Sequence, residues 1–314
     1  MKSLLLGWLR RLPALFSLWR QRLGLAPPPP PPLRQEPSAA PPLPAPAPRA
    51  RLEPPDPEEL SALADQLWGE GFVLPGGAAE ANRLANLLPL SPATTLLLLG
   101  ADAGGAASAI ASTRGAWVAA QQDDLFLAER MALRLRPLGR RATVATWDPT
   151  EPFFRHRYHH HALALEPLRR CASARLLPAI AAGLKPGGQL VLLELVRGAM
   201  PEGRLAASVE RWAELEGRTQ LPETTASVEA SLSAGGFSVN VREDVGARHC
   251  AALMAAWQYR VELMRRNGMP RRPAAVALIS EAERWLLRQR LMQAGSLRLM
   301  RWHATRGADH AGAL

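Results

Sequence analysis

The chain has 314 residues, of which 47% are hydrophobic and 21% charged, enough for one large domain or two modest ones with a sizeable core. The formal net charge is +10, but we find no stripe of basic and aromatic residues in the sequence and expect no nucleic-acid partner. The two cysteines, Cys171 and Cys250, exclude a disulfide-stapled secreted domain and favour a reducing cytoplasm. The abundance of arginine, alanine, leucine and proline is typical of high-GC coding and indicates a bacterial source.

Residues 1–25 are predicted to form a basic amphipathic helix. They contain five basic residues and no acid, and an apolar residue recurs every three or four positions from Leu5 to Leu23. Arginines interrupt the apolar runs, which argues against a spanning helix and leaves too short an apolar core for a secretory signal. We expect either an anchor at a membrane surface or a helix that binds a protein partner. The protein is then cytoplasmic, or peripheral at the inner face of the membrane.

Residues 26–57 are about half proline and are predicted to be a disordered, semi-rigid linker without a packed core. The main globular domain is predicted to occupy residues 58–265, followed by a C-terminal helical extension over 266–314. In that extension Glu283 and Arg284 are expected to be exposed to solvent. Its basic end is interpreted as a solvated face, and the alternative is a surface that binds anionic lipid or a partner. That basic end comprises Arg288, Arg290, Arg298, Arg301 and Arg306.

Within the globular domain, apolar runs of strand length alternate with helical segments. This alternation predicts an α/β fold: a doubly wound, mainly parallel sheet with helices on both faces. In such sheets a ligand binds beyond the carboxyl ends of the strands. Three histidines, His159 to His161, open one strand and alternate in direction, so we expect no metal site there. The five predicted strands are "TTLLLLG" (94–100), "AWVAA" (116–120), "RATVATWD" (141–148), "YHHHALALE" (158–166) and "QLVLLELV" (189–196).

An ordered set of motifs resembles the class I S-adenosylmethionine-dependent methyltransferases. The set comprises "LLLLGADAGG" (96–105), "WDP" (147–149), "LKPGGQLVLLELV" (184–196) and "AGGF" (234–237). The segment "WGEGFVLPGG" (68–77) is similar to the lead-in of the small-molecule branch that includes phosphoethanolamine and sarcosine-type N-methyltransferases.

The resemblance covers roughly residues 60–265 and implies a Rossmann-like, seven-stranded sheet whose last hairpin lies at 234–245. It implies S-adenosylmethionine as the cofactor and a small or lipid-linked acceptor of its methyl group. The cofactor contacts it implies fall on Gly100, Asp102, Gly104, Gln122, Trp147, Asp148 and Glu166.

Two of these positions depart from the family pattern. Asp102 replaces the middle glycine of the turn, where it either contacts the ammonium group or a water, or obstructs the site. Gln122 stands where an acid usually accepts the two ribose hydroxyls, and an amide accepts them more weakly. Asp123 or Asp124 can take over that role, or they are ordinary N-caps of the next helix. Leu98 replaces an acid at the end of the first strand.

The remaining contacts each have a structural alternative. Asp148 either meets the adenine amino group or only opens a turn. Trp147 lies against the adenine ring or in the core, and Glu166 approaches the methionine part of the cofactor or the acceptor. Where the related branch has a histidine that assists catalysis, this chain reads "PLRR" (167–170), so no catalytic residue is assigned. The alternatives to a methyltransferase are an inactive scaffold of the same fold that binds a protein partner at the membrane, and a module that binds anionic surfaces through its arginines.

Overall fold

The computed structural model describes residues 55–100, 102–199, 204–268 and 270–307. Residues 1–25 and nearly all of 26–57 lie outside this range, so the amphipathic helix and the linker stay predictions. None of the helices that the structure describes has the length and apolar character needed to cross a membrane.

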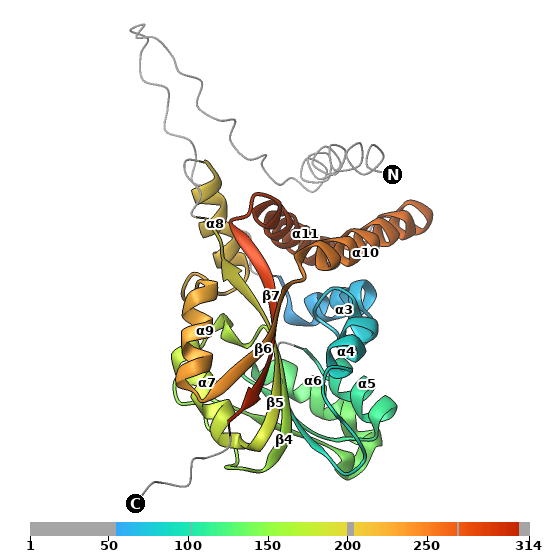
Figure 1. Ribbon diagram of the computed structural model, residues 1–314. Helices are drawn as coiled ribbons and strands as arrows, with labels where there is room; N and C mark the ends of the chain where they lie inside the picture. The colour runs from blue at the N-terminus through green and yellow to red at the C-terminus, as the bar shows by residue number, and fades with distance from the viewer. Residues whose placement is uncertain (1–54, 101, 200–203, 269, 308–314) are drawn as a thin grey trace, which may run out of the picture.

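A seven-stranded sheet in the order β3-β2-β1-β4-β5-β7-β6 forms the centre of the molecule (Figure 1). Strands β1 to β5 pair in parallel, and β7 pairs antiparallel with both β5 and β6. The predicted doubly wound, mainly parallel sheet is confirmed. The strands are β1 (Thr95–Gly100), β2 (Trp117–Gln122), β3 (Ala142–Thr146), β4 (His159–Leu165), β5 (Leu184–Arg197), β6 (Phe237–Asp244) and β7 (Leu297–Arg306).

Helices cover both faces of the sheet, which explains the unbroken apolar run in β1. Leu96 and Leu98 pack into one core with α4 (Gly77–Ala85), α5 (Gly105–Arg114) and α6 (Leu125–Leu135). Leu97 and Leu99 face the other core, with α7 (Ser173–Gly183) and α9 (Thr225–Ala234). All four leucines are buried because successive side chains of a strand point to opposite faces.

A third core lies at the end of the sheet where the parallel strands finish. It joins α3 (Pro57–Trp68), α10 (Gly246–Asn267) and α11 (Arg272–Gln293), which lie together in Figure 1. The rings of Trp68 and Trp285 meet edge to face at 5.1 Å in this core. Helix α8 (Arg204–Leu215) packs against α11 at the same end.

The predicted boundary at residue 265 is wrong. Residues 297–306 of the expected helical extension form β7, which lies inside the sheet between β5 and β6. The predicted hairpin at 234–245 is therefore one strand, β6, and its partner arrives after α10 and α11. The apolar spacing of residues 275–291 correctly indicated a helix, but the alternating pattern of the following strand was read as a basic tail.

Candidate functional site

The glycine turn after β1 is closed by the side chain of Asp102. Its two carboxylate oxygens accept hydrogen bonds from the backbone N–H groups of Gly104 and Ala106, each at 2.7 Å. These donors belong to the first turn of α5, so Asp102 caps that helix from inside the loop. Burial raises the pKa of Asp102 to about 6, although the two backbone hydrogen bonds lower it in part.

The segment "WGEGF" before α4 lies directly on this turn. The carbonyl oxygen of Gly71 accepts hydrogen bonds from the N–H groups of Ala103, at 2.8 Å, and Gly105, at 3.2 Å. A Cβ atom on Gly71 would come within 2.7 Å of the Gly105 nitrogen, so only glycine permits this approach. The lead-in motif is thus part of the site.

Gln122 ends β2 and is fully buried. Its Nε2 atom donates to the carbonyl oxygens of Gly100 and Asp102, both at 2.9 Å. Its Oε1 atom accepts from the backbone N–H groups of Asp123, at 2.9 Å, and Asp124, at 3.2 Å. Both ends of the amide are therefore bonded to backbone, and Gln122 holds the glycine turn against β2.

The two acids after Gln122 have different surroundings. Asp124 is the N-cap of α6, since its Oδ1 atom accepts from the N–H of Leu127 at 3.1 Å. Among the described residues, the one charged group beside the carboxylate of Asp123 is the guanidinium group of Arg170, at 3.7 Å. Of the two, Asp123 is the acid whose oxygens are available to a ligand.

The two residues after β3, Trp147 and Asp148, also have different surroundings. Trp147 is buried, and its backbone N–H donates to the carbonyl oxygen of Gln122 at 3.2 Å, which keeps this residue beside the end of β2. Asp148 is exposed, and one of its oxygens accepts from both the N–H and the hydroxyl of Thr150, each at 2.7 Å. These hydrogen bonds lower the pKa of Asp148. One oxygen of its carboxylate thus takes part in a local turn.

Glu166, directly after β4, is held by an arginine from the far end of the chain. Its backbone has φ of +50°, a left-handed conformation that non-glycine residues seldom adopt. The guanidinium group of Arg288 on α11 donates to both Glu166 oxygens, one at 2.9 Å and the other closer. Burial raises the pKa of Glu166, but Arg288 outweighs burial and lowers it overall.

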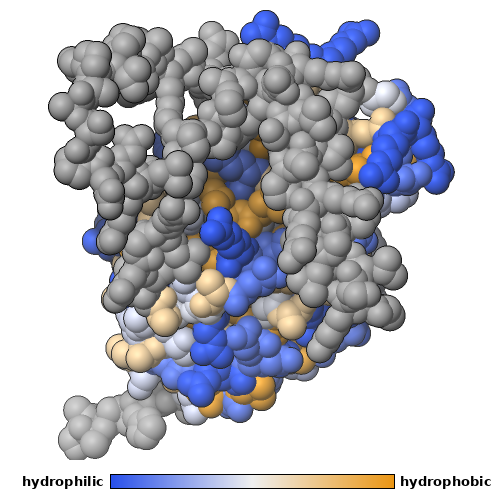
Figure 2. All heavy atoms as spheres, turned by 90° about the horizontal axis from the view of Figure 1, so that it is seen from above, coloured by the Kyte–Doolittle hydropathy of each residue, from blue (hydrophilic) through white to orange (hydrophobic). Residues whose placement is uncertain are grey.

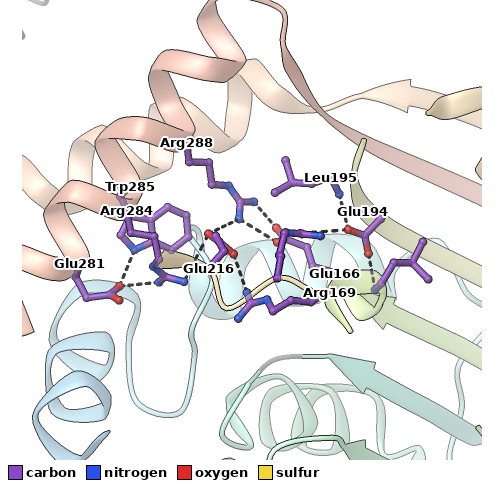
Figure 3. A network of polar contacts seen from close by, with 11 residues as sticks. Glu166, Arg169, Glu194, Leu195, Glu216, Glu281, Arg284, Trp285 and Arg288 are labelled. Atoms are coloured by element: carbon purple, nitrogen blue, oxygen red, sulfur yellow. Dashed lines mark hydrogen bonds and ion pairs between the residues drawn. The ribbon is translucent and has the colours of Figure 1, made fainter. Parts of the chain in front are cut away.

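This pair belongs to a buried group of charges at the carboxyl ends of β4 and β5, here called the carboxyl-edge network (Figure 3). Glu216 lies at its centre, with guanidinium nitrogens of Arg169 at 3.2 Å, Arg284 at 3.6 Å and Arg288 at 3.7 Å. Arg284 also binds Glu281 at 2.6 Å. The network comprises Glu166, Arg169, Glu194, Glu216, Arg218, Glu281, Arg284 and Arg288.

The pKa values of two carboxylates in this network, Glu216 and Glu194, are shifted in opposite directions. Burial alone would raise the pKa of Glu216, but the surrounding arginines, Arg169 first among them, hold it far below its usual range. Glu194 has Arg218 at 3.7 Å, and burial outweighs this attraction and raises its pKa to about 7. The expectation that Arg284 and Arg288 belong to a solvated face is wrong: the Arg288 side chain is fully buried.

Two cavities lie on either side of the glycine turn, each of about 40 Å³. The first lies among Gln122, Asp123, Trp147, Glu166 and Arg170. The second lies over α4 and α5, with Asp102, Phe72 and His249 in its wall. Figure 2, which looks down from above, shows hydrophilic and hydrophobic residues side by side on this end. Ligand pockets usually enclose about 300–1,000 Å³, so a ligand of nucleotide size requires side chains to move.

Comparison with solved structures identifies the fold. The chain is similar to phosphoethanolamine N-methyltransferase 2 of Haemonchus contortus, in complex with phosphomonomethylethanolamine and S-adenosylhomocysteine, with a TM-score of 0.68 and 18% identity. The fold is that of the class I S-adenosylmethionine-dependent methyltransferases. The match covers 78% of this chain and 56% of the Haemonchus contortus protein, so this chain spans less than two thirds of that protein's length.

Two further methyltransferase-fold structures are similar. The cyclopropane synthase MmaA2 from Mycobacterium tuberculosis has a TM-score of 0.61 and 15% identity, over 73% of this chain and 83% of that one. The geranyl diphosphate C-methyltransferase from Streptomyces coelicolor has a TM-score of 0.56 and 14% identity, over 73% and 77%. No protein-family model matches the chain, and no curated protein matches it.

The methyltransferase fold brings most of the predicted site residues to one edge. Four of them, Gly100, Gln122, Trp147 and Glu166, line the first cavity, and Asp102 lines the second. Gly104 is the N-cap of α5 with φ of +100°, and Asp148 turns toward Thr150 instead.

Sequence reasoning missed several members of this edge. Gly71 had a signal in "WGEGF", which was used only for the resemblance. Glu216 and Arg288 had no such signal. Nothing in the local sequence around Arg288 shows that it pairs with Glu166, 122 positions earlier in the chain.

Proposed function

We propose that the protein is an S-adenosylmethionine-dependent methyltransferase that acts on a small acceptor. The observation that carries this proposal is the pair of cavities on either side of the glycine turn, at the edge where this fold binds its ligands. The structural neighbours described above are enzymes with methyl-transfer or related chemistry, so they do not favour the alternative of an inactive scaffold.

The residues of the second cavity fit the cationic part of this cofactor. S-adenosylmethionine carries an ammonium group and a positive sulfonium. Each oxygen of Asp102 accepts one backbone hydrogen bond and keeps a lone pair for a further donor. A buried carboxylate with a raised pKa gains stability when a cation arrives, so Asp102 suits the ammonium group rather than obstructing it.

The residues of the first cavity fit the nucleoside part. Asp123 would accept the ribose hydroxyls in place of Gln122, whose amide is bonded to backbone at both ends. The ring of Trp147 would lie along the adenine. Arg170 is 41% exposed and lies 3.5 and 3.7 Å from the carboxylates of Asp124 and Asp123, so its displacement is the least costly way to widen this cavity.

When bound, the cofactor supplies an electrophilic methyl group to a nucleophilic atom of the acceptor. The chain's own contribution is to hold and align the two molecules and to exclude water, which alone accounts for large accelerations. No residue of the described part is assigned to acid–base catalysis. A lipid-linked acceptor is the alternative to a small one. A membrane surface bound through residues 1–25 and a peripheral cytoplasmic location belong to the proposal with either acceptor.

Calorimetric titration of the full chain with S-adenosylmethionine tests this function. We expect micromolar binding that weakens about tenfold or more in Asp102→Asn, since a charge-assisted contact contributes about 1.5–3 kcal/mol. Affinity should also fall as the pH drops through about 6, where Asp102 takes up a proton and loses its negative charge.

Asp148→Asn is the matched control, because Asp148 follows β3 on the same edge but its carboxylate, among the described residues, bonds only within its own turn. It should bind like the wild type. No binding at millimolar cofactor, by protein that circular dichroism shows to be folded, would contradict the enzyme function. Equal loss in both variants would contradict the role of Asp102.

A further inference from the structure

The opposite end of the sheet carries a second group of arginines. The parallel strands β1 to β5 begin there, at the lower end of the sheet in Figure 1, and the loops that lead into them are rich in cations. We call this the amino-edge surface. Its basic residues are Arg114, Arg136, Arg140, Arg141, Arg155, Arg157 and Lys185.

Five of these arginines have no acidic partner in the part of the chain that the structure describes. Among the described residues, no carboxylate lies within 4.0 Å of Arg114, Arg136, Arg140, Arg141 or Arg155. Arg136, Arg140 and Arg155 are exposed. Neighbouring like charges repel each other, so a surface of this kind is stabilised when an anion from outside the chain binds it.

Exposed aromatic rings are interspersed among these cations. Trp117 is 42% exposed, Tyr158 39% and Phe153 79%. The guanidinium group of Arg141 lies 5.5 Å from the centre of the Trp117 ring, and that of Arg155 lies 4.0 Å from the centre of the Tyr158 ring. Tryptophan and tyrosine rings next to cations are typical of the interface between a bilayer and water.

We propose that the amino-edge surface binds the anionic headgroups of a lipid bilayer. Its cations attract phosphate groups, and its exposed rings enter the headgroup region. The sequence of residues 1–25 is rich in basic residues and tryptophan and has no acid, so the same chain offers two segments of matching chemistry. Two weak contacts on one chain reinforce each other by raising the effective concentration of the second.

The same rings argue against a single-stranded nucleic acid as the partner. Bases stack on open aromatic faces, whereas Trp117 and Tyr158 each have one face covered by an arginine. A bilayer needs no open ring face.

This orientation has a consequence that rests on the proposed function. β1 has six residues, so the two ends of the sheet are roughly 20 Å apart. When the amino edge lies on the bilayer, both cavities face away from it. The methyl acceptor then comes from the aqueous phase rather than from the lipid.

Sedimentation with vesicles tests the surface. The full chain is mixed with vesicles of phosphatidylcholine, with and without phosphatidylglycerol. To remove the contribution of residues 1–25, the experiment is repeated with Arg10, Arg11, Arg20 and Arg22 changed to Gln. The test variant is Arg136→Glu/Arg140→Glu, and the matched control is Arg265→Glu/Arg266→Glu on α10. The control makes the same change in net charge at exposed arginines that already pair with Glu262.

We expect the test variant to bind anionic vesicles about tenfold or more weakly than the control, and rising salt to weaken the wild type. Vesicles of phosphatidylcholine alone should bind neither the test variant nor the control variant. Equal binding by test and control variants overturns the proposal, as does displacement of the wild type from anionic vesicles by single-stranded RNA at lower concentration than lipid.

Both mutated sites are exposed, and circular dichroism checks their folding. If the test variant fails to fold, Arg155→Glu replaces it, with Arg266→Glu as its control. Cofactor titration of the same variants separates the two proposals, because a chain that binds cofactor but not vesicles contradicts only this one.

Discussion

The two ends of the sheet use the same residue type in opposite ways. At the carboxyl end Arg218 and Arg288 have at most 1% of their side chains exposed, and each faces a glutamate. At the amino end Arg136 and Arg140 are exposed, and no described carboxylate pairs with them. A charged group that is buried needs a partner inside the protein. An exposed charged group stays hydrated and is free to bind a group of another molecule. Arginine content alone therefore says little about partners until burial is known.

The largest effect is expected at Arg288. Replacing it with alanine leaves Glu166 and Glu216 buried without their shared cation, so the free energy of unfolding should fall by about 3–5 kcal/mol in urea denaturation. Arg266→Ala is the matched control, because Arg266 is 71% exposed and pairs within its own helix. It should change the free energy of unfolding by less than about 0.5 kcal/mol.

A double variant separates lost charge from lost packing. Arg288→Met/Glu166→Gln removes both partners of the Arg288–Glu166 pair and should recover part of the stability. If Arg288→Ala costs under about 1 kcal/mol, the network does not behave as a buried one, and the comparison between the two ends fails.

The free energy of unfolding should depend on pH through Glu194. Its pKa is about 7 in the folded protein and 4.5 for the ordinary group, so the folded state keeps a proton that the unfolded chain has released. This contribution stabilises the fold below pH 4.5 and is lost as the pH rises to about 7. Glutamine cannot ionise, so the unfolding free energy of Glu194→Gln relative to wild type should rise by about 3 kcal/mol across that window. Urea titrations at several pH values measure it, and a flat difference would contradict the raised pKa.

The smallest effect is expected at the amino end. Arg140→Ala removes an exposed cation from a group of like charges, so the free energy of unfolding should stay within about 0.5 kcal/mol of the wild type, with any change toward greater stability. The same urea measurement checks it. A loss above about 1 kcal/mol would indicate an internal partner for Arg140 and weaken the case for an external one.

The core of this fold was predictable from local patterns. The run "TTLLLLG" has the length and composition of a doubly buried strand, and the alternation with helices predicted the parallel pairing of β1 to β5. The position of β7 was not predictable in this way. Its partner strands are far away in the chain, and alternating arginines on a half-buried strand look like a solvated tail.

The site was predictable in position but not in contacts. Spacing correctly placed Gln122 at the end of β2, and only the structure shows its amide turned to four backbone groups. Asp148 illustrates the same limit: its position matches the motif, but Thr150 two residues later captures its carboxylate. The direction of a polar side chain depends on the hydrogen-bonding groups near it, and the spacing of a motif does not show which groups these are.

The central place of β7 also has a consequence for synthesis on the ribosome. Among the described strands, β6 joins the sheet only through β7, so β5 keeps an open edge and β6 has no described partner strand until Arg306 has been added. About a hundred residues separate the end of β5 from that point, which at about 5–20 residues per second is roughly 5–20 s of translation. During that interval the nascent chain exposes unpaired strand edges of the kind that chaperones recognise. Premature termination before residue 297 should therefore yield aggregates rather than a smaller folded domain.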